Sequence, residues 1–245
     1  MSYSPHNRGY PTAPALPAPQ HPTIDVTPTA VDVPSFSALL DRGMIAAGQP
    51  LILGYTERGV LTGSWKDLYS AAVAGLSGSG KTSTLRFLAA QSALHGARFV
   101  VIDPHADAGI ESLTETLHPL TPSMLCEPAN NAASIIDAAR LVQTQLDARL
   151  RGHPERTPLI VCVDEFSTLV RDDRIANPLG ELLESIAQQG RKVHIFALIA
   201  GHIWTGSRTH GTPLRDSLAA CYVHRLRRQQ ARMLLSTDEA RLYSY

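Results

Sequence analysis

The chain is poor in cysteine and lysine and has no long apolar run, and these shortages narrow the classes of protein it can belong to. No apolar run approaches the roughly 20 residues that a membrane-spanning helix needs. The N-terminus lacks the charged segment and apolar core of a secretory signal, so a cytoplasmic protein without a membrane span is expected. The three cysteines, Cys126, Cys162 and Cys221, have neither metal-ligand nor disulfide-framework spacing, and we expect small buried side chains there.

Positive and negative charges balance, with 22 Lys and Arg against 22 Asp and Glu. A protein held on DNA by charge alone is usually basic overall. The balance therefore argues against a simple sequence-reading DNA-binding protein. It argues less against a ring-shaped motor, in which only the lining of the pore must be basic.

Residues 1–34 differ from the rest, because they hold eight of the 17 prolines and almost no charge. Such a segment buries too little apolar surface to offset the entropy lost on ordering. We expect a disordered proline-rich tail there, either a plain tether or a docking segment for a protein partner. Residues 35–68 are expected to form an entry layer, with a helix over 37–45 and strands over 51–55 and 60–61.

From residue 69 onward, short apolar strands alternate with helices. This alternation predicts an α/β fold in which a mainly parallel sheet carries helices on both faces. One helix is predicted to begin with Asn177 as its N-cap and Pro178 as its first residue. The predicted strands are 70–74, 98–103, 159–163, 193–200 and 219–226, with a short one at 123–126, and the other predicted helices are 80–94 and 133–151.

The segment from Gly75 to Thr82, GLSGSGKT, matches the P-loop pattern G-x-x-x-x-G-K-[ST] in full and lies between a predicted strand and a predicted helix. Its glycines let the backbone wrap so that N–H groups point at phosphate oxygens, and the helix presents its positive end to the same anion. Lys81, one of only three lysines, would reach the β- and γ-phosphates, and the Thr82 hydroxyl would bind Mg²⁺. The predicted nucleotide-binding residues are Gly75, Ser77, Gly78, Ser79, Gly80, Lys81, Thr82 and Ser83.

A second acidic element, Asp164-Glu165, follows the apolar strand LIVCV. In P-loop enzymes an acidic residue at this place holds the magnesium shell, a role we assign to Asp164. Glu165 is placed to polarise the attacking water as a general base. The pair favours hydrolysis of ATP over tight storage of the nucleotide.

Four segments, taken in order, resemble the FtsK/HerA superfamily of RecA-like ring ATPases, which pump DNA. They are LILGYTERGVLTGSWKDLYSAAVAGLSGSGKT, FVVIDPHADAG, LIVCVDEFSTLV and IAQQGRKVHIFALIAGHIW, and the likeness covers residues 50–235. The resemblance implies a RecA-like P-loop NTPase over residues 69–245. It also implies a final strand beyond Tyr245, so this core is expected to be incomplete at its C-terminus.

The resemblance assigns further site residues. Arg191 falls on the family's arginine before the sensor strand, and His202 falls where the family usually has a sensor glutamine. His202 can donate or accept a hydrogen bond there, or it is a histidine of a surface loop. Asp103 and His105, at the end of a strand, either belong to the nucleotide side or have no functional role.

Ring ATPases complete the site with an arginine from the next subunit. The sequence leaves four candidates for it: Arg191, Arg208, Arg215 and Arg225. The most basic stretch, residues 224–228 with Arg232, either touches phosphates of DNA or nucleotide or forms a solvated charged face.

Three functions are consistent with these residues. The first is a homo-oligomeric, hexameric ring that uses Mg-ATP hydrolysis to move double-stranded DNA. The second is a nucleotide-dependent switch or partner-binding ATPase without translocation, which the histidine at position 202 and the neutral charge favour. The third is a small-molecule kinase, against which the Asp164-Glu165 pair and the lack of an obvious lid argue.

Overall fold

The computed structural model describes residues 33–56, 59–68, 70–206 and 212–235. Its centre is a five-stranded parallel sheet in the order β4-β5-β6-β3-β7. The α/β fold with a parallel sheet, predicted from the alternation of apolar strands and helices, is confirmed. The strands are β3 (Ser70–Ala74), β4 (Arg98–Ile102), β5 (Leu159–Val163), β6 (Ile195–Gly201) and β7 (Ala220–Val223).

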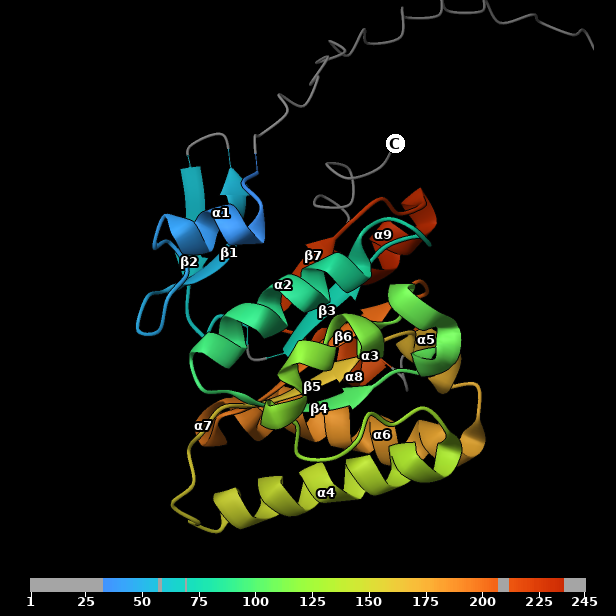
Figure 1. Cartoon of the computed structure of the whole chain (residues 1–245). Helices are drawn as coiled ribbons and strands as arrows, with labels where there is room; N and C mark the ends of the chain where they lie inside the picture. Colours follow the sequence, from blue (N-terminus) through green and yellow to red (C-terminus); the bar gives the residue numbers. More distant parts are fainter. Residues whose placement is uncertain (1–32, 57–58, 69, 207–211, 236–245) are drawn as a thin grey trace, which may run out of the picture. The chain divides into compact units, whose positions relative to one another are not determined.

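Helices cover both faces of this sheet (Figure 1). Alternate residues of a strand point to opposite faces, so Ala72 and Ala74 belong to one apolar cluster and Ala71 and Val73 to the other. The first cluster packs against α4 (Ala132–Leu150) and α6 (Asp173–Ser185), the second against α2 (Lys81–Leu94) and α3 (Leu113–Thr116). Because both faces are buried, the strands are continuous apolar runs without alternation.

The remaining described elements are short. They are α1 (Phe36–Asp41), β1 (Leu51–Thr56), β2 (Gly59–Gly63), η1 (Ala106–Glu111), η2 (His118–Ser123), α5 (Phe166–Leu169), η3 (Ile186–Gly190), α7 (Arg191–Val193), α8 (Thr212–Asp216) and α9 (Arg228–Leu234). None of the helices in the described part of the chain is long and apolar enough to span a membrane.

The hairpin β1–β2 is fixed to α2 through Gln91. The buried Gln91 amide accepts a hydrogen bond from the Ile52 N–H at 2.8 Å and donates one to the Ile52 carbonyl at 3.0 Å. Phe36 of α1 packs edge-on against Phe87 of α2, with ring centroids 5.9 Å apart. The segment of α1, β1 and β2 therefore packs against α2, the helix that follows the P-loop.

The predicted start of the helix at Asn177 and Pro178 is wrong. α6 begins at Asp173, and the Asp172 side chain caps it by accepting from the Arg174 N–H at 3.0 Å. Pro178 lies in the second turn, where its missing N–H deprives only the carbonyl of the exposed Arg174 of a helical partner. Water can satisfy that carbonyl, so the helix tolerates the proline.

Other boundaries also shift. The strand predicted over 193–200 begins at Ile195, because His194 takes a left-handed conformation (φ 59°). Residues 123–126 contribute only an isolated bridge, Met124 to Phe99, since the preceding residues form the 3-10 turn η2. The predicted tail lies outside the described residues except for Val33 and Pro34.

Candidate nucleotide site

The chemistry-bearing residues predicted from the sequence follow strands that end at one edge of the sheet. Because the strands are parallel, Gly75 after β3, Asp164 after β5 and His202 after β6 come to the same side. Asp103 after β4 and His224 after β7 complete the row. This carboxyl edge is where open α/β sheets bind ligands.

The loop after β3 has the backbone of a phosphate cradle. Gly78 and Gly80 take positive φ angles of 68° and 101°, a conformation that side chains with a Cβ rarely adopt. Gly75 is required for a different reason: a Cβ there would overlap Ser79 Oγ and lie 2.8 Å from His224 Cβ. The glycine positions of the motif are therefore fixed by conformation and by close approach.

The loop residues fit a bound phosphate chain. The Ser79 hydroxyl is buried and has no hydrogen-bond partner within the described chain, so an incoming acceptor would satisfy it. α2 begins at Lys81 with no side-chain cap, which leaves the first N–H groups of the helix for an anion. Thr82, in its first turn, and the buried Asp164 are the residues that would hold Mg²⁺.

Lys81 is 6% exposed, and its ammonium reaches over the loop. Its Nζ donates to the Leu76 carbonyl at 3.3 Å and lies 4.0 Å from Glu165 Oε1. Burial lowers the pKa of Lys81, and Glu165 and Asp164 oppose that shift. A triphosphate would stabilise the charged ammonium further, so binding of the anion and protonation of Lys81 reinforce each other.

His202 joins the loop to the acidic pair. Its Nδ1 lies 2.7 Å from the Gly75 carbonyl oxygen, which can only accept, so Nδ1 carries the proton and donates. Its Nε2 lies 2.6 Å from Glu165 Oε1, within hydrogen-bonding distance. Lys81 Nζ is 3.2 Å from Nδ1. His202 therefore lies beside the P-loop and the acidic pair, and its role as a sensor stays a prediction.

Glu165 has strained backbone geometry, with φ 49° and ψ 37° at a non-glycine residue. Such angles are uncommon and cluster at functional sites, where the surrounding structure holds them in place. The strain lies at the turn from β5 into α5. It brings the Glu165 side chain back toward Lys81 and His202.

Asp164 is 8% exposed and accepts one hydrogen bond, from the Glu165 N–H at 2.9 Å. Burial raises the pKa of Asp164; the Glu165 N–H and Lys81 act against this, and the Glu165 and Asp103 carboxylates add to it. Asp103 is also buried, but the N–H groups of His105 and Thr114 occupy its carboxylate, at 2.9 and 2.8 Å. Asp103 thus shapes its loop, and His105 is exposed.

Solved structures share this arrangement of strands and helices. The conjugation coupling protein TcpA of pCW3, in its monomer form with ATPγS, superposes with a TM-score of 0.65 at 16% identity, over 81% of this chain and 61% of that one. The cytoplasmic domain of EssC matches at 0.55 and 17%, over 78% of this chain and 38% of that one. The chain has the fold of the FtsK/HerA ATPases.

The cytoplasmic domain of the Type VII secretion ATPase EccC of Thermomonospora curvata has the FtsK/HerA fold too, with a TM-score of 0.55 at 20% identity, over 76% of this chain and 21% of that one. This chain therefore spans less than two thirds of each of these proteins. No protein-family model matches the sequence, and no curated protein is similar to it in sequence.

His224 contacts the P-loop. The sequence had placed this residue only within the basic stretch 224–228 and had not predicted the contact. Its Nε2 lies 3.0 Å from Thr84 Oγ1, and its ring would lie 3.6 Å from a Cβ on Gly80. Burial lowers the pKa of His224, a hydrogen bond to the Ser79 backbone opposes this, and Lys81 adds to it. The signal was its position directly after β7, which places it at the carboxyl edge.

The arginine candidates lie at different edges of the FtsK/HerA sheet. Arg225 follows β7, and its carbonyl accepts from the Leu76 N–H at 2.9 Å, so it lies beside the P-loop. Arg191 and Arg215 precede β6 and β7, so they lie at the opposite edge of the sheet, where the strands begin, which we call the amino edge. β6 has seven residues, which puts Arg191 about 20 Å from the site at the other end. Arg208 lies outside the described residues.

Proposed function

We propose that the chain is an ATP-hydrolysing motor of the FtsK/HerA type, which acts as a hexameric ring on double-stranded DNA. The observation that carries the proposal is the convergence of Lys81, Glu165 and His202 over a complete P-loop. A site that only stored nucleotide would need the loop and Lys81, but not a strained carboxylate held beside them.

In the proposed reaction, water attacks the γ-phosphorus in line with the leaving oxygen. The bond from water oxygen to phosphorus forms, the bridging bond to ADP breaks, and the proton of the water passes to Glu165. Lys81 offsets the charge that develops on the phosphate oxygens. His202 holds the Glu165 carboxylate in place. Thr82 and Asp164 would hold Mg²⁺, which when bound supplies further charge neutralisation.

In a ring, the next subunit would supply the arginine that completes the nucleotide site. The amino edge carries a hollow of about 430 Å³ lined by Lys66, Arg191, Lys192 and His194, and these include two of the three lysines of the chain. Head-to-tail packing would bring this edge of one subunit against the carboxyl edge of the next. Arg191 then acts on the neighbour's triphosphate, in agreement with its distance from the site of its own chain.

The names of two structurally similar proteins bear on what the motor moves. TcpA is named a conjugation coupling protein and EccC a Type VII secretion ATPase, and these two names support a motor over a small-molecule enzyme. The alternative is a nucleotide-dependent switch that binds a partner and translocates nothing. It is favoured by the Glu165–His202 pair, which engages the proposed base before nucleotide binds.

Steady-state ATP hydrolysis with and without linear double-stranded DNA tests the motor, beside a Glu165→Gln variant. We expect DNA to stimulate turnover several-fold. We expect Glu165→Gln to lower kcat by about 10²–10⁴-fold while ATP still binds, because the variant keeps the shape of the side chain but not its basicity.

Turnover that ignores DNA, at concentrations where subunits assemble, would refute the motor and leave the switch. Phosphoryl transfer to a nucleoside or metabolite would instead indicate the kinase. The matched control is Glu184→Gln, the same substitution near the C-terminal end of α6.

A further inference from the structure

The loop after β4 carries an exposed apolar side chain next to acidic ones. Ile110 of η1 is 84% exposed, more than any other large apolar side chain in the described part of the chain. Gly109 before it takes φ 81° and ψ −152°, a backbone conformation that is essentially limited to glycine. Asp107 and Glu115, on either side of Ile110 in the sequence, are exposed too, and residues 99–139 contain no lysine or arginine. The loop is therefore an apolar tip within a negatively charged stretch of chain.

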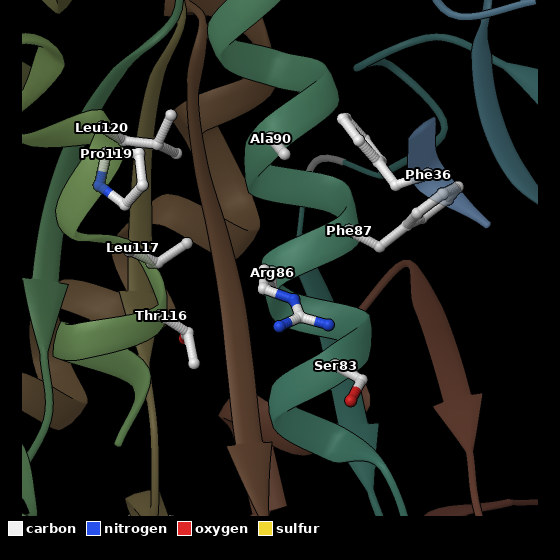
Figure 2. A pocket seen from close by; sticks show the side chains of 9 residues that line it. All are labelled: Phe36, Ser83, Arg86, Phe87, Ala90, Thr116, Leu117, Pro119 and Leu120. Atoms are coloured by element: carbon white, nitrogen blue, oxygen red, sulfur yellow. The ribbon is translucent and has the colours of Figure 1, made fainter. Parts of the chain in front are cut away.

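This loop leads into α3, which lies beside the nucleotide site. Thr116 of α3 and Thr82 of the P-loop line one hollow of about 210 Å³. Figure 2 shows Thr116 and Leu117 across from Arg86 on α2, the helix that begins at the P-loop. A neighbouring subunit that reaches the triphosphate from the carboxyl edge would therefore come close to η1 on this flank of the site.

The other flank of the nucleotide site is basic. Arg225, Arg227 and Arg228 follow β7, and all three are exposed. The Leu76 N–H donates to the Arg225 carbonyl at 2.9 Å, so this segment adjoins the P-loop. Residues 217–235 contain no aspartate or glutamate. The two flanks thus differ in sign, negative at η1 and α3 and positive after β7.

The hollow at the amino edge is basic as well, and it is lined by four side chains, those of Lys66, Arg191, Lys192 and His194. Lys66 and Lys192 are exposed. Asp67, which follows Lys66, already accepts from the Ser64 N–H and hydroxyl group, at 2.7 and 2.8 Å. A lysine can pack its carbon stem on an apolar side chain while its ammonium group reaches a carboxylate. This basic hollow therefore matches an apolar tip with acidic neighbours.

We propose that the basic hollow of one subunit receives loop η1 of the next subunit in the ring. Ile110 packs against the carbon stems of Lys66 and Lys192. The Asp107 carboxylate pairs with their ammonium groups. The inference rests on the proposed function, because Arg191 must reach the neighbour's nucleotide for the hollow to come near η1. Docking on the flank after β7 would instead place like charges together, which is unfavourable.

The same charges select how the subunits pack. Two amino edges that face each other would bring two basic hollows together. A head-to-tail contact pairs the hollow with a loop of opposite charge. Such a contact is heterologous, so each subunit uses its hollow toward one neighbour and its loop toward the other, and a ring can close.

The scarcity of lysine makes a chemical test specific. Lys81 is buried, so Lys66 and Lys192 are the lysines that a reagent can reach. A water-soluble carbodiimide joins a lysine amine to a touching carboxylate as an amide, with loss of water. Full-length protein, unlabelled and nitrogen-15-labelled in equal parts, is assembled with Mg²⁺ and ATPγS, treated and digested. We expect mass spectrometry to find either lysine joined to an acidic residue of 107–115 in another chain. Links to 164–173 alone, or no link between chains in the assembled protein, would overturn the inference.

Charge reversal tests the same pair through assembly. Sedimentation velocity with Mg²⁺ and ATPγS gives the protein concentration of half-assembly. We expect Lys192→Glu and Asp107→Lys each to raise it about tenfold or more, since like charges then meet. The variant with both changes should return to within about threefold of the wild type, because its charges attract again. Asp107 gives up one long hydrogen bond, from Asn130 Nδ2 at 3.4 Å, so the fold should tolerate the change. Arg140→Glu with Asp137→Lys is the matched control, since this pair lies within one chain.

The outcomes separate the inference from the proposed ring. A wild-type protein that stays monomeric with nucleotide would refute the ring and the inference together. Assembly of the wild type and of both single variants at the same concentration would overturn the inference alone. So would a loss in both single variants without recovery in the double variant. Normal assembly of Lys192→Glu with weaker binding to linear double-stranded DNA would assign the hollow to DNA phosphates instead.

Discussion

The Nε2 atom of His202 lies 2.6 Å from Oε1 of Glu165, within hydrogen-bonding distance across the ends of β5 and β6. The other ring nitrogen donates to the Gly75 carbonyl at 2.7 Å. His202 therefore links the first glycine of the P-loop to the carboxylate proposed as the base. A change in the loop on nucleotide binding would reach Glu165 through this side chain as well as through Lys81, whose Nζ lies 4.0 Å from Glu165 Oε1.

His202→Ala removes both hydrogen bonds. We expect kcat for ATP hydrolysis to fall by about 10–100-fold, because an unrestrained Glu165 no longer positions the water. The Kd of ATP should stay within about threefold, and His202→Gln, which keeps a donor, should retain more of the activity. Single-turnover kinetics with the exposed His153→Ala as control measure this. If His202→Ala hydrolyses ATP as fast as the wild type, the hydrogen bond from His202 does not position Glu165 for catalysis.

Asp164→Asn should stabilise the nucleotide-free protein. Burial raises the pKa of Asp164, so the Asp164 carboxyl group holds its proton more tightly in the folded state than in the unfolded state. Its contribution to stability is then fully present below the unfolded pKa of the carboxyl and is lost as pH rises through the folded pKa. At neutral pH the ionised carboxylate destabilises the fold, and asparagine carries no such charge.

We expect Asp164→Asn to raise Tm at pH 7 by about 2–4 °C, which corresponds to about 1 kcal/mol for a chain of this size. The variant should also lose the increase in ATP affinity that Mg²⁺ gives. Thermal unfolding with and without EDTA measures both, and the exposed Asp137→Asn is the control. A Tm that is unchanged or lower at pH 7 would contradict the sign.

Mixing two inactive variants tests whether Arg191 acts on a neighbour. Lys81→Ala keeps the arginine and loses its own phosphate site, and Arg191→Ala does the reverse. If Arg191 acts across subunits, the mixture should regain a fraction of wild-type turnover that neither variant shows alone. Arg215→Ala replaces Arg191→Ala in the control mixture, since it lies at the same edge. A mixture with no activity above the sum of its parts would contradict the trans assignment.

Arg149→Met should destabilise the fold without weakening ATP binding. Arg149 is 4% exposed, and its Nη1 donates to the carbonyls of Thr157, Val193 and His194 at 2.9, 3.0 and 3.3 Å. These groups lie at the amino edge, and methionine would remove all three hydrogen bonds, although the His194 carbonyl would still accept from the Leu159 N–H at 2.9 Å. We expect a loss of about 2–4 kcal/mol in the free energy of unfolding. Urea unfolding measures it beside the exposed Arg140→Met, and a loss below 1 kcal/mol would contradict this role.

Much of the site could be predicted from the sequence because it depends on neighbours in the chain. The glycines at 78 and 80 take positive φ angles, the apolar runs of β3 and β5 are buried on both faces, and Lys81 opens the helix after the loop. Conformation of this kind is set by a few consecutive residues.

The tertiary structure decided what depends on distant residues. Pro178 fits the start of a helix by local rules, yet α6 begins at Asp173, where the Asp172 cap and the packing against α4 outweigh that preference. The order of the strands places Arg225 beside the P-loop and Arg191 at the opposite edge. It also brings His202 to Glu165, 37 positions apart in the sequence, because only parallel pairing aligns the ends of β5 and β6.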